Sequence, residues 1–409
     1  MKIFIAIITL ILIVSCRTEV LENKTPNIKV SLNASNEQQT VSSELCLNFE
    51  IQGEKVPQLY LTNAIGSTII TGTRKNSHIR YCFPKSYTRH AGLLKWKMVS
   101  NGEIIENGEV NMRPDSTFVF MESYFGPRQI TAGDIDFSML TNIPTDQFDN
   151  LLPDGTTVTI KRQFENQMDE YAIETSGGIA WKNIGATKKA GRMLVSSACL
   201  GTYSKQLTTM VYSAIPADFT IHYERDHSFA DGNQILTLKT SKIVDDYNNI
   251  VSDGTYVNFI VEDASGTLLR TSGNTQNGMA IAKILHPERP TKWNIKAYVT
   301  GAATSNRLAV SFDQSVKDFE VSFDENEREV VIGPLYGFIN QKVPDGISIT
   351  IELKSEEHLI LEKTKLFTKN GMTSLKLPAE FYPPGTYAIT INSMGIKKEL
   401  TIKLYGDKK

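Results

Sequence analysis

Apolar and polar residues alternate with a period of two after each of three Asp-Gly pairs. In the best-preserved copy, Val257, Phe259 and Val261 share one face of the segment that follows the pair. Asp favours a turn because its side chain can bond its own backbone, and Gly adopts a positive φ without a steric penalty. Alternation that begins directly after a turn predicts a half-buried β-strand. The pairs are Asp154-Gly155, Asp253-Gly254 and Asp345-Gly346.

A second turn signal follows each pair at a nearly constant distance. The last Gly of this signal lies 23, 24 and 25 residues beyond the Gly of the first, at Gly178, Gly278 and Gly371. Two of these glycines follow Asn and one follows Gly. Copies at such regular spacing indicate a repeated β-domain, and a period of about 90–100 residues corresponds to a whole domain rather than a solenoid unit.

The repeat divides the chain into four β-domains, at residues 26–114, 115–216, 217–316 and 317–405. The first lacks the Asp-Gly pair but follows the last domain in its second half, so we interpret it as a divergent copy. The second has extra residues between Ile130 and Asp154, including residues 141–148. This predicts a longer loop, which is either a contact site or simply an insertion at low cost in folding free energy.

The third domain carries the most specific motifs. It reads DGTYVNFIVEDASGTLL from Asp253, QNGMAIAKIL from Gln276 and WNIKAYV from Trp293. These segments resemble the bacterial immunoglobulin-like domains of the invasin and intimin type. The resemblance implies an all-β fold of tandem immunoglobulin-like antiparallel β-sandwich domains. The second domain lacks the Asn and the fourth lacks the Thr after Asp-Gly, and fold alone does not imply function.

The N-terminus has the features of an export signal. Lys2 precedes a twelve-residue apolar run that ends at Ser15-Cys16, too short to span a bilayer comfortably. It resembles the signal of a bacterial lipoprotein, as in Bacteroidota. The resemblance implies cleavage after residue 15, acylation (palmitate) of Cys16, a tether at 16–25 and anchoring in the outer membrane, facing the periplasm or the cell surface. An ordinary signal peptide with a chance Cys is the alternative.

Two further cysteines lie on predicted strands of the first domain. In an immunoglobulin-like sandwich, the strands of Cys46 and Cys82 would be neighbours, so the resemblance implies a disulfide between them. Export makes this chemistry available. Two buried thiols are the alternative. Cys199 is left over and is expected to be buried in the second domain.

Composition and motifs exclude several functions. The net charge is −2 and the pI about 6.4, so no nucleic-acid partner is indicated. The chain has no G-x-S-x-G, H-E-x-x-H, P-loop or G-x-G-x-x-G motif. We therefore expect no enzyme, no catalytic residue and no cofactor.

Two clusters offer metal-ligand chemistry, but in each the simpler interpretation is favoured. The first could bind a metal or form a solvated linker between the second and third domains. The second could be a calcium loop or a turn. We predict no metal site in either. The first cluster is His222, Asp226, His227 and Asp231, and the second runs from Asp245 to Asn249.

Two surface features remain. A basic group could face lipid headgroups or anionic glycan, with a solvated face as the default; it comprises Lys182, Lys188, Lys189 and Arg192. Asp115-Ser116-Thr117 resembles the short O-glycosylation signal of Bacteroidota, which would place a glycan on Ser116. A motif of three loosely defined residues is expected about once by chance in this chain.

The sequence thus predicts a lipid-anchored envelope protein. Its immunoglobulin-like array would mediate adhesion or act as a binding scaffold or spacer, with a protein or glycan partner at the envelope. The alternative is an accessory lipoprotein subunit of an outer-membrane secretion, assembly or uptake complex.

Overall fold

In the computed structural model, the described residues are 30–32, 38–355 and 360–406, and most of them lie in strands. They fall into two compact units. One holds the chain up to Phe125 with Met139–Asn183 and Leu194–Leu207, and the other holds Gly126–Ser138, Ile184–Met193 and the chain from Thr208. Cys16, the expected signal peptide and the tether lie outside the described residues. Within the described ranges, no helix is long and apolar enough to cross a bilayer.

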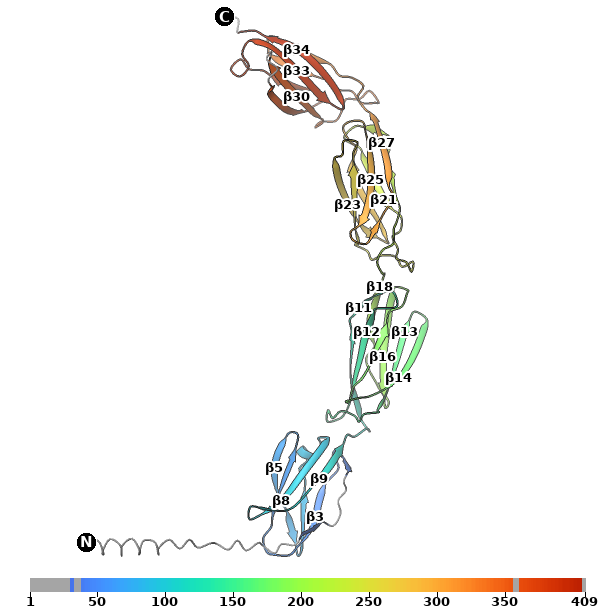
Figure 1. The fold of residues 1–409 in the computed structure, drawn as a ribbon, viewed down its shortest axis with the longest axis vertical. Coiled ribbons are helices and arrows are strands. Elements are labelled where there is room, and N and C mark those ends of the chain that lie inside the picture. The colour runs from blue at the N-terminus through green and yellow to red at the C-terminus, as the bar shows by residue number, and fades with distance from the viewer. Residues whose placement is uncertain (1–29, 33–37, 356–359, 407–409) are drawn as a thin grey trace, which may run out of the picture. The chain divides into compact units, whose positions relative to one another are not determined.

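The first sandwich forms the blue part of Figure 1. Its sheets have the orders β1-β3-β7-β6 and β2-β9-β8-β4-β5. The inward side chains of β3 alternate with exposed ones, and Phe49 packs edge-on against Tyr81 and Trp96. Such aromatic pairs add about 1 kcal/mol each to the burial of their area. The elements are β1 (Val30–Leu32), β2 (Gln38–Thr40), β3 (Cys46–Ile51), β4 (Gln58–Asn63), β5 (Gly66–Thr71), β6 (Thr73–Lys75), β7 (His78–Cys82), α2 (Lys85–Thr88), β8 (Gly92–Ser100) and β9 (Glu103–Arg113).

The expected disulfide is present in this sandwich. Cys46 on β3 lies directly opposite Cys82 on the neighbouring β7, and their sulfur atoms are 2.13 Å apart. The bond closes a loop with a sequence separation of 36 residues. On loop-closure grounds it stabilises the sandwich by roughly 3–4 kcal/mol. The alternative of two buried thiols is thereby excluded.

The second sandwich has sheets with the orders β10-β12-β15 and β11-β18-β16-β13-β14, and β17 pairs with β16. Its core includes Val119, Leu152, Val158 and Ala180, together with the buried thiol of Cys199. The strands are β10 (Val119–Gly126), β11 (Gln129–Thr131), β12 (Phe137–Asp146), β13 (Thr157–Phe164), β14 (Gln167–Glu174), β15 (Ala180–Gly185), β16 (Gly191–Cys199), β17 (Thr202–Tyr203) and β18 (Leu207–Tyr212).

In the third sandwich, hydrogen bonds connect the strands of both layers into one continuous sheet. Its order is β19-β21-β24-β23-β22-β25-β27-β20, and β26 pairs with β25. Its core is built around Trp293, Phe259 and Phe312. The strands are β19 (Ile221–Glu224), β20 (Phe229–Ala230), β21 (Ile235–Thr240), β22 (Tyr256–Glu262), β23 (Leu268–Gln276), β24 (Met279–Leu285), β25 (Thr291–Val299), β26 (Ala303–Thr304) and β27 (Leu308–Gln314).

The fourth sandwich has sheets with the orders β28-β29-β32 and β31-β30-β33-β34. Ile349, Ile351 and Leu353 of β30 point into its core, as the alternation after Asp345-Gly346 requires. The strands are β28 (Val321–Asp324), β29 (Glu329–Ile332), β30 (Ser348–Ser355), β31 (Ile360–Phe367), β32 (Thr373–Lys376), β33 (Gly385–Ser393) and β34 (Ile396–Leu404).

The longer loop expected in the second sandwich is not found. Residues 141–146 continue strand β12 instead. The expectation counted the residues from Ile130 to Asp154, so it began at β11. The strand of the third sandwich that is equivalent to β11 is β20, because β11 and β20 each pair in parallel with the last strand of their sandwich. Compared from equivalent strands, the two repeats have nearly the same length, so no insertion is needed.

The Asp-Gly pairs are turns held by the second turn signal. Gly155, Gly254 and Gly346 have φ values of 84°, 86° and 92°. In each repeat, the Asp carboxylate accepts a hydrogen bond from a backbone N–H of the second signal, at 2.6–2.9 Å. The two signals of the sequence repeat are therefore one structural unit.

Replacing Gly254 with valine should destabilise the third sandwich by about 1–3 kcal/mol. An added Cβ would meet no described atom within 4 Å, so the cost arises from the positive φ alone. Gly185 has the same open space and no positive φ, which makes Gly185→Val the matched control. Calorimetry of the soluble chain should show one lowered transition for Gly254→Val. A wild-type melting profile would contradict the strain argument.

Candidate functional site

Exposed aromatic side chains gather on the outer face of the sheet β10-β12-β15. Val119, Leu140 and Ala180 of these strands are buried, so the alternate residues point to solvent. These outward residues, with Phe118 directly before β10, form what we name the aromatic face. Its members are 46–63% exposed: Phe118, Phe120, Tyr124, Met139 and Trp181.

The equivalent surface of the fourth sandwich is polar, and that of the third is mixed but not aromatic. In the third, the outward residues of β19, β21 and β24 include an ion pair of Glu224 with Lys239, and Lys283, beside the exposed aliphatic side chains of Ile235, Met279, Ile281 and Leu285. In the fourth, they include Asp324 and Lys376. The fold therefore tolerates charge at this face and does not require aromatic residues there. Single exposed apolar residues are ordinary, whereas a contiguous group of them marks an interaction site.

Polar groups also lie on the aromatic face: the hydroxyl of Tyr124, the indole N–H of Trp181 and the exposed carboxylate of Glu122, between Phe120 and Tyr124 on β10. The hydroxyl of Tyr124 donates a hydrogen bond to Glu122, at 2.8 Å. This bond and the carboxylate charge raise the pKa of Tyr124, so the phenol stays protonated. Glu122 thereby fixes the phenol group at the surface, where the ring remains free to contact a partner.

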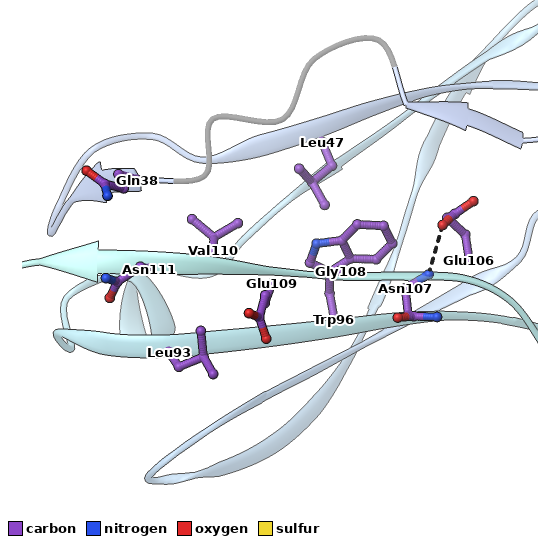
Figure 2. A pocket seen from close by; sticks show the side chains of 10 residues that line it. All are labelled: Gln38, Leu47, Leu93, Trp96, Glu106, Asn107, Gly108, Glu109, Val110 and Asn111. Carbon is purple, nitrogen blue, oxygen red and sulfur yellow. Dashed lines mark hydrogen bonds between the residues drawn. The ribbon is translucent and has the colours of Figure 1, made fainter.

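A hollow of about 550 Å³ lies in the first sandwich, as Figure 2 shows. Its floor consists of Leu47, Trp96 and Val110, which are buried and belong to the core. Trp96 lies against Gly108, where a Cβ would come within 2.5 Å of the indole ring. The other lining side chains are amides, carboxylates and one leucine: Gln38, Leu93, Glu106, Asn107, Glu109 and Asn111. Because no lining aromatic ring is exposed, the aromatic face is the stronger candidate for a binding site.

A paired Asp and Asn hold the connection that precedes the second sandwich. Asn150 donates to the carbonyl of Arg89 and accepts from the N–H of Ala91, each at 2.8 Å. Asp146 accepts from the backbone of Phe148 and Asn150 and from the N–H of Asp115. One five-residue loop thus bonds both to the first sandwich and to the connecting segment.

The same arrangement recurs one repeat later. Asn249 donates to the carbonyl of Lys188 at 2.7 Å and accepts from the N–H of Ala190 at 2.8 Å. Asp245 accepts from Ala214, where the connecting segment begins. Burial alone would raise the pKa of Asp245, but its hydrogen bonds outweigh that effect and the pKa is lowered. Because its oxygens already accept these bonds, the stretch from Asp245 to Asn249 is a structural turn and not an open calcium loop.

The histidine cluster differs from its sequence interpretation. His222 and Asp226 are exposed, whereas His227 and Asp231 are largely buried and meet His286. Phe338 also lies against His227, so the cluster faces the fourth sandwich and not the second. A solvated linker is therefore the wrong description of this segment.

The cluster does not fit a metal ion in this arrangement. Nδ1 of His227 accepts the N–H of Phe229, so the proton of the neutral ring is on Nε2, which faces Asp231. Nδ1 of His286 lies 2.9 Å from the carbonyl of Phe229 and must carry its proton. Both nitrogens that face the carboxylate are therefore donors, and a metal ligand needs a lone pair.

Two lysines of the predicted basic group have side-chain partners. Lys182 lies over the ring of Tyr171, 4.6 Å from its centre, and Lys188 pairs with Asp134 at 3.5 Å. Ser116 is exposed in the turn before β10. Its glycosylation stays a prediction.

Three threonines that the sequence repeat did not single out also hold its turns. Their hydroxyl groups donate to the carbonyl two residues before the Gly of each Asp-Gly pair and accept from the N–H that follows this Gly. Each precedes the last Gly of the second turn signal by three residues, so this constant spacing could have identified them. The residues are Thr175, Thr275 and Thr368.

Comparison with known proteins places the fold. No family model and no curated protein matches the chain. FdeC, an Escherichia coli adhesin, is 15% identical over 70% of this chain and 96% of its own, with a TM-score of 0.50. Invasin, a bacterial integrin-binding protein, is 12% identical over 92% and 79%, with a TM-score of 0.45. The D1–D4 fragment of ICAM-5 is 9% identical over 92% and 99%, with a TM-score of 0.37.

These likenesses concern the fold. The chain consists of tandem immunoglobulin-like β-sandwiches, as the repeat and its resemblance to invasin-type domains predict.

Proposed function

We propose that this chain is a lipid-anchored protein of the cell envelope whose immunoglobulin-like array binds a protein partner through the aromatic face. The observation that carries the proposal is the exposed group of Phe120, Tyr124, Met139 and Trp181 on one sheet. Its structural neighbour FdeC is an adhesin, which supports adhesion as the role of this binding. Among the residues that the structure describes, no catalytic constellation supports an enzyme.

The chemistry of the aromatic face favours protein over glycan. Protein interfaces are enriched in Trp, Tyr, Phe and Met, the residue types found here. A glycan presents hydroxyl groups that need hydrogen-bond partners, which Phe120 and Met139 cannot supply. Rigid aromatic rings provide large contact areas at a low cost in conformational entropy.

The anchor gives a separate prediction. Cys16→Ala should move most of the protein from the membrane fraction to the soluble fraction, because the acyl chains that hold it are lost. Cys199→Ala, which alters a cysteine of the second sandwich, is the control and should leave the protein in the membrane fraction. Labelling of wild-type cells with a fatty acid should mark the protein. Absence of label would contradict the anchor.

Affinity purification from detergent-solubilised envelopes and from intact cells tests the function. We expect a partner that is captured by the wild type and lost when Trp181 and Phe120 are replaced by serine. Protease treatment of intact cells should degrade the array if it faces outward. A membrane protein recovered at fixed stoichiometry with both forms would instead support the accessory-subunit alternative.

A further inference from the structure

The connection between the third and fourth sandwiches is built differently from the two before it. Eight residues before the Asp-Gly pair, the second and third sandwiches have Asp146 and Asp245, whereas the fourth sandwich has Gly337. Four residues before the pair, Gln341 stands where they have Asn150 and Asn249. Phe338 stacks on Phe229, with ring centroids 4.2 Å apart and planes at 13°. Ring packing thus joins two hydrogen bonds at this connection, from Gln314 to the carbonyl of Met394 and from Ser348 to Glu288.

Two histidines support this ring packing. The ring of His227 lies 4.6 Å from Phe338, and the ring of His286 lies 5.3 Å from His227. The backbone of Phe229 bonds both: its N–H donates to Nδ1 of His227 and its carbonyl accepts from Nδ1 of His286. Asp231, whose carboxylate also accepts from Asn233 and Gln234, faces both rings.

This arrangement requires neutral imidazoles. A second proton on His227 would occupy Nδ1, where the N–H of Phe229 already points, so that bond would be lost. A second proton on His286 would occupy Nε2, which is buried and has no hydrogen-bond partner among the described residues. A buried charged donor without an acceptor is strongly unfavourable.

The surrounding charges do not rescue the protonated form. Burial lowers the pKa of His286, and the carbonyl of Phe229 and the charge of Asp231 offset only part of this effect. The charge of Arg225 lowers it further, and a proton on His227 would do the same. Two other nearby carboxylates already accept hydrogen bonds: Asp313 accepts from Ser228, and Glu288 accepts from Ser348 of the fourth sandwich.

We propose that this connection is a proton-sensitive hinge, in which neutral His227 and His286 hold Phe338 against Phe229 and their protonation releases it. Opening exposes the imidazoles to water, which favours their protonated form. Because the closed state binds fewer protons, it is favoured at neutral pH and loses its advantage as the pH falls. The hinge is independent of the aromatic face and goes beyond the binding proposed above.

Distance measurement between spin labels on the soluble full array tests the hinge. Lys283→Cys on β24 and Lys376→Cys on β32 provide exposed label sites, while Cys46 and Cys82 are bonded and Cys199 is buried. At pH 7.5 we expect a narrow distance distribution. At pH 5 its width should at least double.

Variants connect this response to the histidines. In His227→Gln, the amide can still accept from Phe229 and donate to Asp231 but cannot titrate, so at least half of the acid broadening should disappear. His286→Leu together with His227→Gln should remove the rest. His222→Gln, which changes an exposed histidine of the same sandwich, should broaden like the wild type. An unchanged width of the wild type at pH 5, or full broadening in His227→Gln, would overturn the hinge.

Discussion

Replacing Asp245 with alanine is expected to destabilise the third sandwich by about 4 kcal/mol. Its two carboxylate oxygens accept four hydrogen bonds at 2.7–2.9 Å, and the residue is only 2% exposed. Removing the acceptor leaves several donors without a partner, each at a cost of about 1–3 kcal/mol. The lowered pKa adds a pH dependence: this stability is present above pH about 4 and is lost as the pH falls further.

Asp246→Ala provides the matched control for this variant. Asp246 is exposed and directly follows Asp245, so its loss should change the free energy of unfolding by less than about 0.5 kcal/mol. Calorimetry and amide exchange at Tyr247 and Asn249 measure the difference. Equal stability of the two variants would show that the carboxylate does not hold the turn.

The double variant Phe120→Ser and Trp181→Ser is expected to weaken partner binding at least about 100-fold. Aromatic residues at the centre of an interface commonly contribute 2 kcal/mol or more each, and each 1.4 kcal/mol is a factor of ten in affinity. Both side chains are about 60% exposed, so their loss should leave the sandwich folded. Binding of the captured partner by surface plasmon resonance gives the change.

Exposed apolar residues of another sandwich serve as the control for binding. Ile281 and Leu285 on β24 are 53% and 56% exposed. Their replacement by serine should change the affinity less than threefold. A comparable loss from this pair would show that general surface hydrophobicity, rather than the aromatic face, determines binding.

The repeat and its turns could be predicted because their signals are local. Asp253 and Gly254 are adjacent, and the alternation of Val257 and Phe259 is read directly from the chain. The Cys46–Cys82 bond followed from the neighbouring strands that an immunoglobulin-like fold implies. In contrast, the partners of Asn249 lie about 60 residues away in another sandwich, where no spacing rule relates them.

The aromatic face and the histidine cluster depend on long-range pairing. Phe120, Met139 and Trp181 are far apart in sequence and share a surface only because their strands lie in the order β10-β12-β15. His286 follows Asp231 by 55 residues, so the local cluster of acids and histidines gave no sign of it. The apparent insertion near residue 141 arose from comparing strands that are not equivalent.

Site-specific photo-crosslinking tests the central claim most directly. A benzophenone amino acid in place of Tyr124 stands on the aromatic face, and the same residue in place of Tyr256 stands on β22 at a similar exposure, 59% against 54%. On intact cells, we predict a protein adduct from position 124 and none from position 256. Absence of an adduct at position 124, equal adducts from both positions, or an adduct that only a glycosidase removes would contradict the proposal that the aromatic face binds a protein.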